Sequence, residues 1–225
     1  MIYAVNIDNV KFDELSSFFD RLSSTNRKKV NNLINEKDKI RTALGELLVK
    51  YLLVNIKKMD IGQIKLNFTE YGKPFIDEKN IYFNISHSGG YVVCVINDSK
   101  IGIDIEKVKS IDFKVISKTY FSNEENSIIS KYKGKKQLYY FYLLWTLRES
   151  YLKLDGRGLN LIDQISFSNI NDDYQLLING ELNSRYKFFS LYFDNYVCSV
   201  CSSQKQSYDL KIIDIKNILN FYSLI

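Results

Sequence analysis

The chain has 225 residues, of which 45% are hydrophobic and 14% aromatic, and this composition excludes an intrinsically disordered protein. Its net charge of +5 suits phosphorylated ligands or an acidic partner, but it does not imply nucleic-acid binding. No stretch reaches the roughly 18 apolar residues of a membrane span, and residues 2–7 lack the features of a signal peptide. We therefore expect a cytoplasmic protein without membrane contact.

The first part of the chain predicts a globular core of strands and amphipathic helices. Apolar residues recur at helical spacing in two segments, and a basic segment lies between them. A single proline, Pro74, sits with Gly72 in a sequence typical of a turn. The predicted elements are a strand at residues 2–7, a helix at 11–22, a basic loop at 26–29, a helix at 35–56, a strand at 64–68 and a turn at 70–75.

Residues 83–106 concentrate the chemically informative side chains. An apolar strand is predicted to enter a polar turn at residues 84–90, where hydroxyl groups and backbone amides can face a ligand. In residues 101–106 isoleucines alternate with Gly102, Asp104 and Glu106, so a strand places both carboxylates on one face. Two like charges on one face repel each other, and the stretch contains no obvious cation to balance them. We interpret the two acids as part of a site for a divalent metal.

The second part of the chain predicts two further helices, several short antiparallel strands and a tail made of a strand and a helix. Ser122 and Glu125 have the spacing of a helix capping box. The three cysteines lie in apolar runs and are interpreted as core thiols rather than as a zinc site. The predicted helices cover residues 113–120 and 137–154, a turn follows at 155–158, the strands fall within 162–201, and the tail covers 210–225.

Four sequence blocks occur in a fixed order along the chain. They are Gly72-Lys73-Pro74, residues 84–89 (Asn-Ile-Ser-His-Ser-Gly), residues 102–106 (Gly-Ile-Asp-Ile-Glu) and residues 145–153 (Trp-Thr-Leu-Arg-Glu-Ser-Tyr-Leu-Lys). Together these blocks resemble the Sfp-type 4'-phosphopantetheinyl transferases. The resemblance implies a monomeric α+β protein of two similar halves related by a pseudo-twofold axis, with the active site in the cleft between them. Residues 1–100 would supply phosphate and adenine contacts, and residues 101–225 the metal site, catalytic helix, carrier docking and tail.

The resemblance also implies an activity. Members of this family transfer the 4'-phosphopantetheine arm of coenzyme A to a serine of an apo acyl or peptidyl carrier protein and release adenosine 3',5'-bisphosphate. The reaction uses Mg²⁺, with Mn²⁺ as an alternative, and carriers of fatty-acid, polyketide and nonribosomal peptide synthesis all remain open. Two other functions stay open as well: a metal-dependent phosphohydrolase and a non-catalytic coenzyme A or nucleotide-binding protein.

Residue roles follow from the resemblance, position by position. The metal ligands would be Asp104, Glu106 and Glu149, and Glu149 and Lys153 share one helix face because they are four residues apart. Glu149, directly or through a metal-bound water, is the first choice for the base that accepts the serine proton. Glu125 is the second choice, with helix capping nearly as favoured. The catalytic set is Glu149, Lys153, His87 and Glu125, and the coenzyme-binding set is Lys29, Thr42, Lys73, Pro74, Ser86, His87, Ser88, Asp104, Glu149 and Lys153.

The sequence departs from the family pattern at three positions, and it suggests where a carrier would dock. Asn26 stands where relatives often have a lysine, Arg148 replaces a lysine while keeping the charge, and Gly90 stands where a larger residue is common. The basic segment 131–136 and Arg157 predict electrostatic help to docking, with residues 158–165 as apolar contacts. Because no cation is evident near Asp104, we expect Asp104→Ala to leave thermal stability unchanged or raised.

Overall fold

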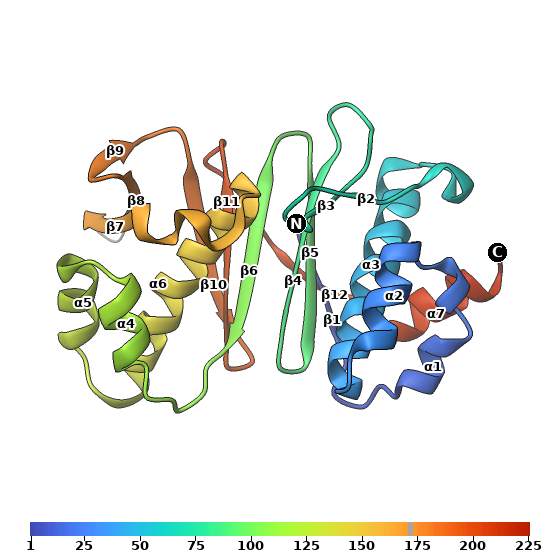
Figure 1. Ribbon diagram of the computed structural model, residues 1–225, viewed down its shortest axis with the longest axis horizontal. Coiled ribbons are helices and arrows are strands. Elements are labelled where there is room, and N and C mark those ends of the chain that lie inside the picture. The colour runs from blue at the N-terminus through green and yellow to red at the C-terminus, as the bar shows by residue number, and fades with distance from the viewer. Residues whose placement is uncertain (171–172) are drawn as a thin grey trace. The chain divides into compact units, whose positions relative to one another are not determined.

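The computed structural model describes residues 1–170 and 173–225 and divides the chain into two compact units (Figure 1). Unit 1 contains residues 1–97 and 208–225, and unit 2 contains residues 98–207. Each unit packs one helix of 22 residues against a β-sheet. The structure therefore has the predicted α+β composition with two similar halves. Within the described ranges, no helix combines the length and apolar character needed to cross a membrane.

Unit 1 is built on a four-stranded sheet in the order β12-β1-β5-β4. Strand β1 pairs antiparallel with β5 and parallel with β12, and β4 and β5 form an antiparallel hairpin. The elements of unit 1 are β1 (Ile2–Asn6), α1 (Phe12–Ser16), α2 (Ser24–Asn32), α3 (Glu36–Lys57), β2 (Asn67–Phe68), β3 (Pro74–Phe75), β4 (Tyr82–Ser88), β5 (Tyr91–Asn97), β12 (Leu210–Ile212) and α7 (Ile215–Ser223), with short 3₁₀ turns at Phe19–Arg21 and Ile61–Gln63.

Helix α3 is the core of unit 1. Its apolar side chains recur every three or four residues and are buried, while the Asn35 side chain caps its first turn by accepting from the amide of Asp38. Helix α3 packs closely on β4 at Gly45, where a Cβ atom would lie in van der Waals contact with Cγ2 of Ile85, at 3.4 Å. The helix thus confirms the prediction for residues 35–56 to within one residue at each end.

Three predictions for residues 11–68 are wrong in detail. The basic loop at residues 26–29 is part of helix α2, because the Ser23 hydroxyl caps the helix by accepting from the amide of Asn26. The helix predicted at 11–22 is interrupted between α1 and the 3₁₀ turn at Phe19–Arg21. The strand predicted at 64–68 is reduced to the two residues of β2.

The predicted polar turn at residues 84–90 is mostly strand. Residues up to Ser88 pair with β5, and Ser88 faces Tyr91, so only Gly89 and Gly90 form the turn. Gly89 has a φ of +53°, a conformation that glycine adopts without steric cost. The side chains of this block therefore alternate between the two faces of β4, with Ser86 and Ser88 on one face and His87 on the other.

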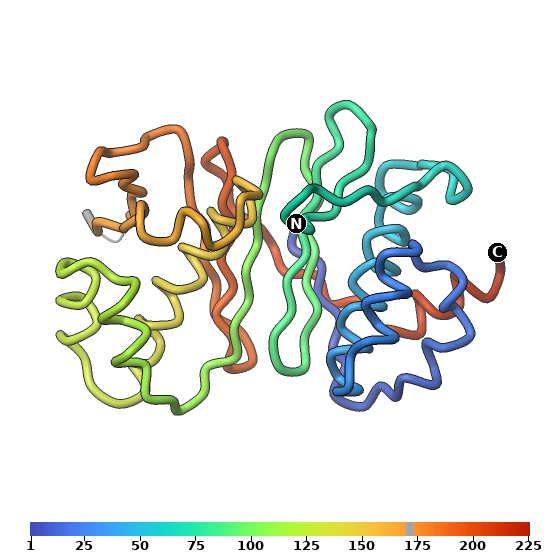
Figure 2. Tube along the Cα trace, viewed as in Figure 1, coloured from blue at the N-terminus to red at the C-terminus, as the bar shows by residue number. Residues whose placement is uncertain are grey.

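The C-terminal tail belongs to unit 1, and not to the C-terminal half in which the sequence analysis placed it (Figure 2). Strand β12 pairs with β1 in parallel, and α7 buries Ile218 and Tyr222 in the core of unit 1. The Tyr222 hydroxyl donates to the backbone oxygen of Leu47 at 2.9 Å. Non-local strand pairing and this buried contact decide the placement, and neither can be read from local sequence.

Unit 2 contains two antiparallel three-stranded sheets, ordered β10-β11-β6 and β7-β8-β9. Helix α6 packs along the first sheet (Figure 1). The elements are β6 (Ile101–Lys107), α4 (Lys114–Tyr120), α5 (Asn123–Ser130), α6 (Gly134–Asp155), a 3₁₀ turn (Gly158–Gln164), β7 (Ile165–Ile170), β8 (Asp173–Ile178), β9 (Glu181–Asn183), β10 (Lys187–Phe193) and β11 (Tyr196–Ser202).

The predictions for unit 2 are largely confirmed. The two helices appear as α4 and α6, Ser122 and Glu125 form the capping box, and Gly156 ends α6 with a φ of +94°. The antiparallel strands begin at Ile165, while the preceding residues from Gly158 form a 3₁₀ turn. Residues 171–172 of the predicted strand region lie outside the described ranges. All three cysteines are buried, as predicted, and none forms a disulfide within the described residues.

Candidate active site

The close approach of α6 to β6 creates the candidate site of unit 2. A Cβ atom on Gly102 would lie 2.0 Å from the backbone oxygen of Ser150 and 2.5 Å from the backbone nitrogen of Leu154. Only glycine permits this contact between the strand and the helix backbone. The face of β6 that carries Gly102 and Asp104 is therefore covered by α6, and residues 101–105 are buried on both faces of the strand rather than on one.

Asp104 is paired with a cation, which corrects the expectation that none lies nearby. Its Oδ1 atom accepts from Nζ of Lys153 at 2.6 Å, and Asp104 is only 3% exposed. Lys153 comes from the C-terminal part of α6, 49 residues further along the chain, and no local sequence pattern could reveal the contact. The pair balances a buried negative charge that would otherwise be costly.

Glu149 lies in the same electrostatic environment as Asp104. Burial is the main cause that raises the pKa of Glu149, and the negative charge of Asp104 raises it further. The charges of Lys153 and Arg148 act in the opposite direction, but the net shift is upward. The structure thus places the paired charges of Asp104 and Lys153 within electrostatic range of Glu149. Glu106 is half-buried and lies two residues beyond Asp104 on β6.

The predicted three-ligand metal cluster is not gathered in this structure. Across residues 1–170 and 173–225, no group of three histidine, cysteine, aspartate or glutamate side chains is placed to hold a metal ion. In this arrangement the ammonium group of Lys153 is bound to the carboxylate of Asp104. The donors nevertheless suit Mg²⁺, which commonly takes one or two carboxylates and completes its octahedron with phosphate oxygens and water. Asp104 and Glu149 fit this requirement.

Glu125, the second choice for the catalytic base, has a structural role. Its carboxylate accepts from both terminal nitrogens of Arg148, at 3.0 and 3.1 Å, and both side chains are fully buried. The same carboxylate accepts from the amide of Ser122 and so closes the capping box. Arg148 also donates to the backbone oxygen of Ile165 and lies over the ring of Phe121. Glu125 therefore joins α5, α6 and β7, and the capping alternative is the one that the structure supports.

A row of buried and half-buried hydroxyl groups beside Asp104 was missed by the sequence analysis. Ser190 on β10, Ser199 on β11 and Asp104 on β6 are directly opposite one another in the sheet. The Ser199 hydroxyl bonds that of Ser190 at 2.8 Å and that of Thr146 on α6 at 2.7 Å. The available signal was a serine at the centre of the apolar strand of residues 196–201, where a polar side chain needs a buried partner.

In unit 1, the predicted coenzyme-binding residues lie on β4, α3 and the turn before β3. Ser86 is buried, Ser88 and Thr42 are half-buried, and His87 is exposed. Arg41, the neighbour of Thr42 on α3, donates through two nitrogens to the backbone oxygen of Gly89. Arg41 therefore ties α3 to the turn that follows His87 and Ser88, a role that the sequence analysis did not assign.

Lys73 and Pro74 follow a tight turn, and Lys29 lies on α2. The Lys73 backbone nitrogen donates to the Thr69 hydroxyl, and Gly72 has a φ of +79°. Pro74 begins β3, which pairs with β2. Lys29 is exposed in the last turn of α2. Asn26, which replaces a basic residue of the family pattern, donates instead to Oε2 of Glu46 at 2.7 Å.

Comparison with known proteins shows the family to which the chain belongs. Residues 9–99 match the N-terminal domain of the 4'-phosphopantetheinyl transferases, and residues 100–201 match the 4'-phosphopantetheinyl transferase superfamily. The chain is 36% identical to the 4'-phosphopantetheinyl transferase Sfp of Bacillus subtilis over 71% of this chain and 72% of that protein. It is 32% identical to the transferase gsp of Aneurinibacillus migulanus, over 96% of this chain and 90% of that protein. A crystal structure of Thermotoga maritima holo-[acyl-carrier-protein] synthase aligns with 46% of this chain and 61% of its own, at 17% identity and a TM-score of 0.38.

The two units thus belong to a known class of α+β enzymes that act on phosphopantetheine. The chain is a member of the 4'-phosphopantetheinyl transferase family and, within that family, of the Sfp type.

Proposed function

We propose that the protein transfers the 4'-phosphopantetheine arm of coenzyme A to a serine of an apo carrier protein. The observation that carries the proposal is the group formed by Asp104, Lys153 and Glu149. All three residues lie within residues 100–201, which match the transferase superfamily. Phosphoryl transfer depends on positioning and on charge neutralisation more than on covalent chemistry by the protein. A paired carboxylate and ammonium beside a second carboxylate meet that requirement.

The reaction forms a bond between the carrier serine oxygen and the phosphorus that bears the pantetheine arm. The bond from that phosphorus to the leaving adenosine 3',5'-bisphosphate breaks, and Glu149 accepts the serine proton. The pKa of Glu149 is raised toward neutral pH, as suits a general base. Lys153 donates to the pyrophosphate, whose oxygens compete with Asp104 for the ammonium group. A Mg²⁺ ion held by Asp104 and Glu149, with Glu106 as a further candidate, would supply additional charge neutralisation.

Residues of unit 1 would hold the coenzyme. Lys29 and Lys73 provide cations for its phosphates, and His87 is exposed and can donate a hydrogen bond to a phosphate oxygen. Thr42, Pro74, Ser86 and Ser88 would line the coenzyme pocket. The bond from Arg41 to Gly89 supports this proposal, because it fixes the turn next to His87 and Ser88.

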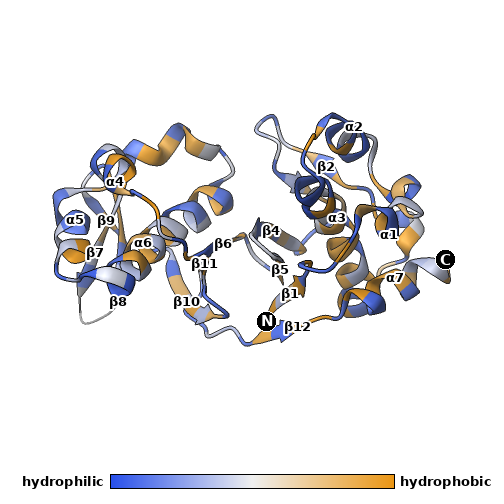
Figure 3. Ribbon diagram, turned by 90° about the horizontal axis from the view of Figure 1, so that it is seen from below, coloured by the Kyte–Doolittle hydropathy of each residue, from blue (hydrophilic) through white to orange (hydrophobic). Residues whose placement is uncertain are grey.

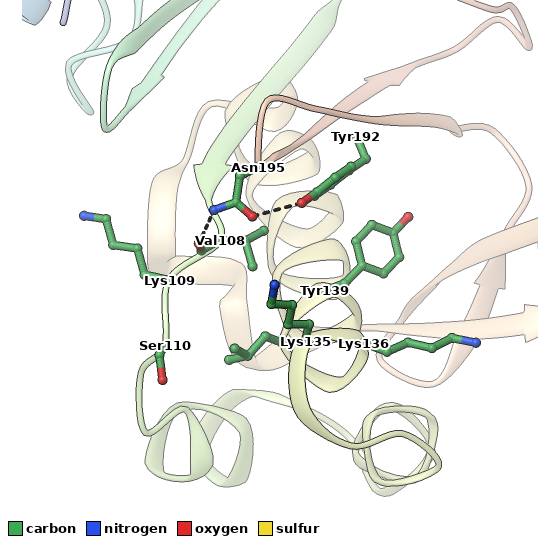
Figure 4. Close-up of a pocket in the computed structure, with 9 residues that line it drawn as sticks. Val108, Lys109, Ser110, Lys135, Lys136, Tyr139, Tyr192 and Asn195 are labelled. Carbon is green, nitrogen blue, oxygen red and sulfur yellow. Dashed lines mark hydrogen bonds between the residues drawn. The ribbon is translucent and has the colours of Figure 1, made fainter.

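A groove in unit 2 is our candidate for carrier docking. It has a volume of about 770 Å³, which lies in the range of ligand sites. Asn195 donates to the backbone oxygen of Val108 and accepts from the hydroxyl of Tyr192, so the walls are held by hydrogen bonds (Figure 4). The groove begins two residues beyond Glu106 on the chain. The residues that line it are Val108, Lys109, Ser110, Lys135, Lys136, Leu138, Tyr139, Tyr192 and Asn195.

The charges of this groove suit an acidic carrier. Its lining contains three lysines, and Figure 4 shows the ammonium group of Lys135 directed toward Val108 and Asn195. Lys109 and Lys136 extend outward, and the ammonium group of Lys136 lies 4.4 Å from the centre of the Tyr132 ring. Lys133, Lys135 and Lys136 come from the predicted basic segment at residues 131–136. Positive charges around an apolar floor favour fast association with an acidic, amphipathic surface.

Incubation with coenzyme A, Mg²⁺ and several apo carrier proteins, analysed by intact mass, tests the proposed function. We expect an added mass of about 340 Da on the carrier serine, the phosphopantetheine group left by phosphoryl transfer. A control without carrier should leave coenzyme A intact. Hydrolysis of coenzyme A in that control would favour the phosphohydrolase alternative, and binding of coenzyme A without transfer to any carrier would favour a binding protein.

A further inference from the structure

Glu46 is a buried carboxylate in the middle of α3, and it binds four donors. It is 1% exposed. Its Oε1 atom accepts from the backbone nitrogen of Ser23 at 2.7 Å and from Nζ of Lys50 at 2.8 Å. Its Oε2 atom accepts from the Ser23 hydroxyl at 2.9 Å and from the Asn26 side chain at 2.7 Å. A buried acid with this number of charge-assisted or dipolar bonds fixes its partners firmly.

Helix α2 depends on these bonds because it has little else to hold it. It has nine residues, and Val30 is its only buried residue. Most of α2 is hydrophilic (Figure 3). Isolated helices of this length are marginal in water, and helices in proteins are usually stabilised by packing of an apolar face. The bonds from Ser23 and Asn26 to Glu46 therefore set the position and rotation of α2 against α3.

Glu46 fixes α2 without placing an unbalanced negative charge beside it. Lys50, one turn further along α3, pairs with Glu46 and also donates to the backbone oxygen of Arg21 at 2.5 Å. The segment that enters α2 is thus held at residues 21, 23 and 26. The exposed cations of α2, Lys28 and Lys29, keep their positive field available for an anion.

We propose that Glu46 is a positioning residue for coenzyme A, which acts through α2 on Lys29. This inference rests on the proposed function, in which Lys29 binds a phosphate of the coenzyme. Asn26 and Lys29 are three residues apart and are neighbours on the helix surface. A change in the anchor at Asn26 therefore moves the base of the Lys29 side chain. At position 26, where the family pattern often has a lysine, this chain has Asn26, whose side-chain amide donates to Glu46.

Glu46→Gln tests the proposal. It keeps the shape of the side chain, but it replaces one carboxylate oxygen, a hydrogen-bond acceptor, by an NH₂ group that would face the donors of Ser23, Asn26 or Lys50. We expect the Kd for coenzyme A, measured by calorimetry, to rise about 5- to 10-fold, the size of one ordinary net hydrogen bond. At saturating coenzyme A, kcat should stay within about twofold, and KM for the carrier should not change. In a Lys29→Ala background, Glu46→Gln should add less than about twofold to the Kd.

Tyr222→Phe is the matched control. It removes the bond from α7 to the backbone of Leu47, the neighbour of Glu46 on α3, and keeps all four donors of the Glu46 carboxylate. This variant should lose thermal stability with an unchanged Kd for coenzyme A. The proposal is overturned if Glu46→Gln weakens coenzyme binding no more than Tyr222→Phe does, or if the effects of Glu46→Gln and Lys29→Ala are additive. Failure of the unmodified protein to bind coenzyme A would instead refute the proposed function.

Discussion

Two ion pairs in unit 2 are expected to respond differently when one acid is replaced by its amide. Glu125 and Arg148 are both fully buried. In the other pair the side chain of Asp104 is 5% exposed, whereas that of Lys153 is 30% exposed. Glu125→Gln and Asp104→Asn are matched substitutions, because each exchanges one carboxylate oxygen for an amino group. The comparison tests whether the Glu125–Arg148 pair stabilises the fold while the Asp104–Lys153 pair is needed for the reaction.

The expected magnitudes follow from what remains after each substitution. Glu125→Gln leaves the Arg148 charge without access to water, and its Nε atom already has no hydrogen-bond partner within the described residues. Breaking such a pair costs about 3–5 kcal/mol, or about 6–20 °C in Tm for a chain of this size. Asp104→Asn leaves Lys153 able to turn toward water and removes a charge that opposes Glu149. We expect a loss of about 1–2 kcal/mol.

Thermal melts, urea denaturation and the transfer assay on both variants check this prediction. Asp104→Asn should abolish transfer with a modest loss of stability, and Glu125→Gln should lose much more stability but keep transfer when assayed well below its Tm. The pairing with Lys153 replaces the expectation from sequence that removal of Asp104 leaves stability unchanged or raised. If Asp104→Asn destabilised the protein as much as Glu125→Gln does, Asp104 would be structural and the reasoning would fail.

Three further predictions test other parts of the structure. Gly102→Ala should destabilise the protein by about 3 kcal/mol or more in urea denaturation, because the new Cβ atom would overlap the α6 backbone. Gly62→Ala is the control: its Cβ atom would have no atom closer than 3.7 Å, so the urea midpoint should change little. The raised pKa of Glu149 means that the folded state binds its proton more tightly than the unfolded state, so this group lowers stability as pH rises from its ordinary value of 4.5 through the raised value. Glu149→Gln should therefore gain stability relative to the parent at pH 8 and lose that advantage at pH 4; an equal difference at both values would contradict the assigned shift. Lys135→Glu should raise KM for an acidic carrier at low salt, with the difference lost near about 1 M salt, and a salt-independent difference would exclude electrostatic steering.

The sequence by itself determined the elements whose signals are local. The apolar spacing of α3 and α6 predicts both helices, and the capping box at Ser122 marks the start of α5. The ordered sequence blocks identify the family and the acids at 104, 106 and 149, because those residues are recognisable without knowledge of their partners. Local errors arose where a polar side chain served as a cap or where a strand carried polar residues, as at α2 and β4.

Only the tertiary structure decided which charges are paired and where the tail belongs. Lys153 meets Asp104 because α6 crosses β6 at Gly102, and Glu125 is occupied because α5 packs on α6 beside Arg148. The tail joins unit 1 through backbone hydrogen bonds with β1, to which almost any sequence of strand residues could contribute. Pairing energies of this kind depend on distance and burial in three dimensions, and residues 49 or 175 positions apart leave no local pattern of their contact.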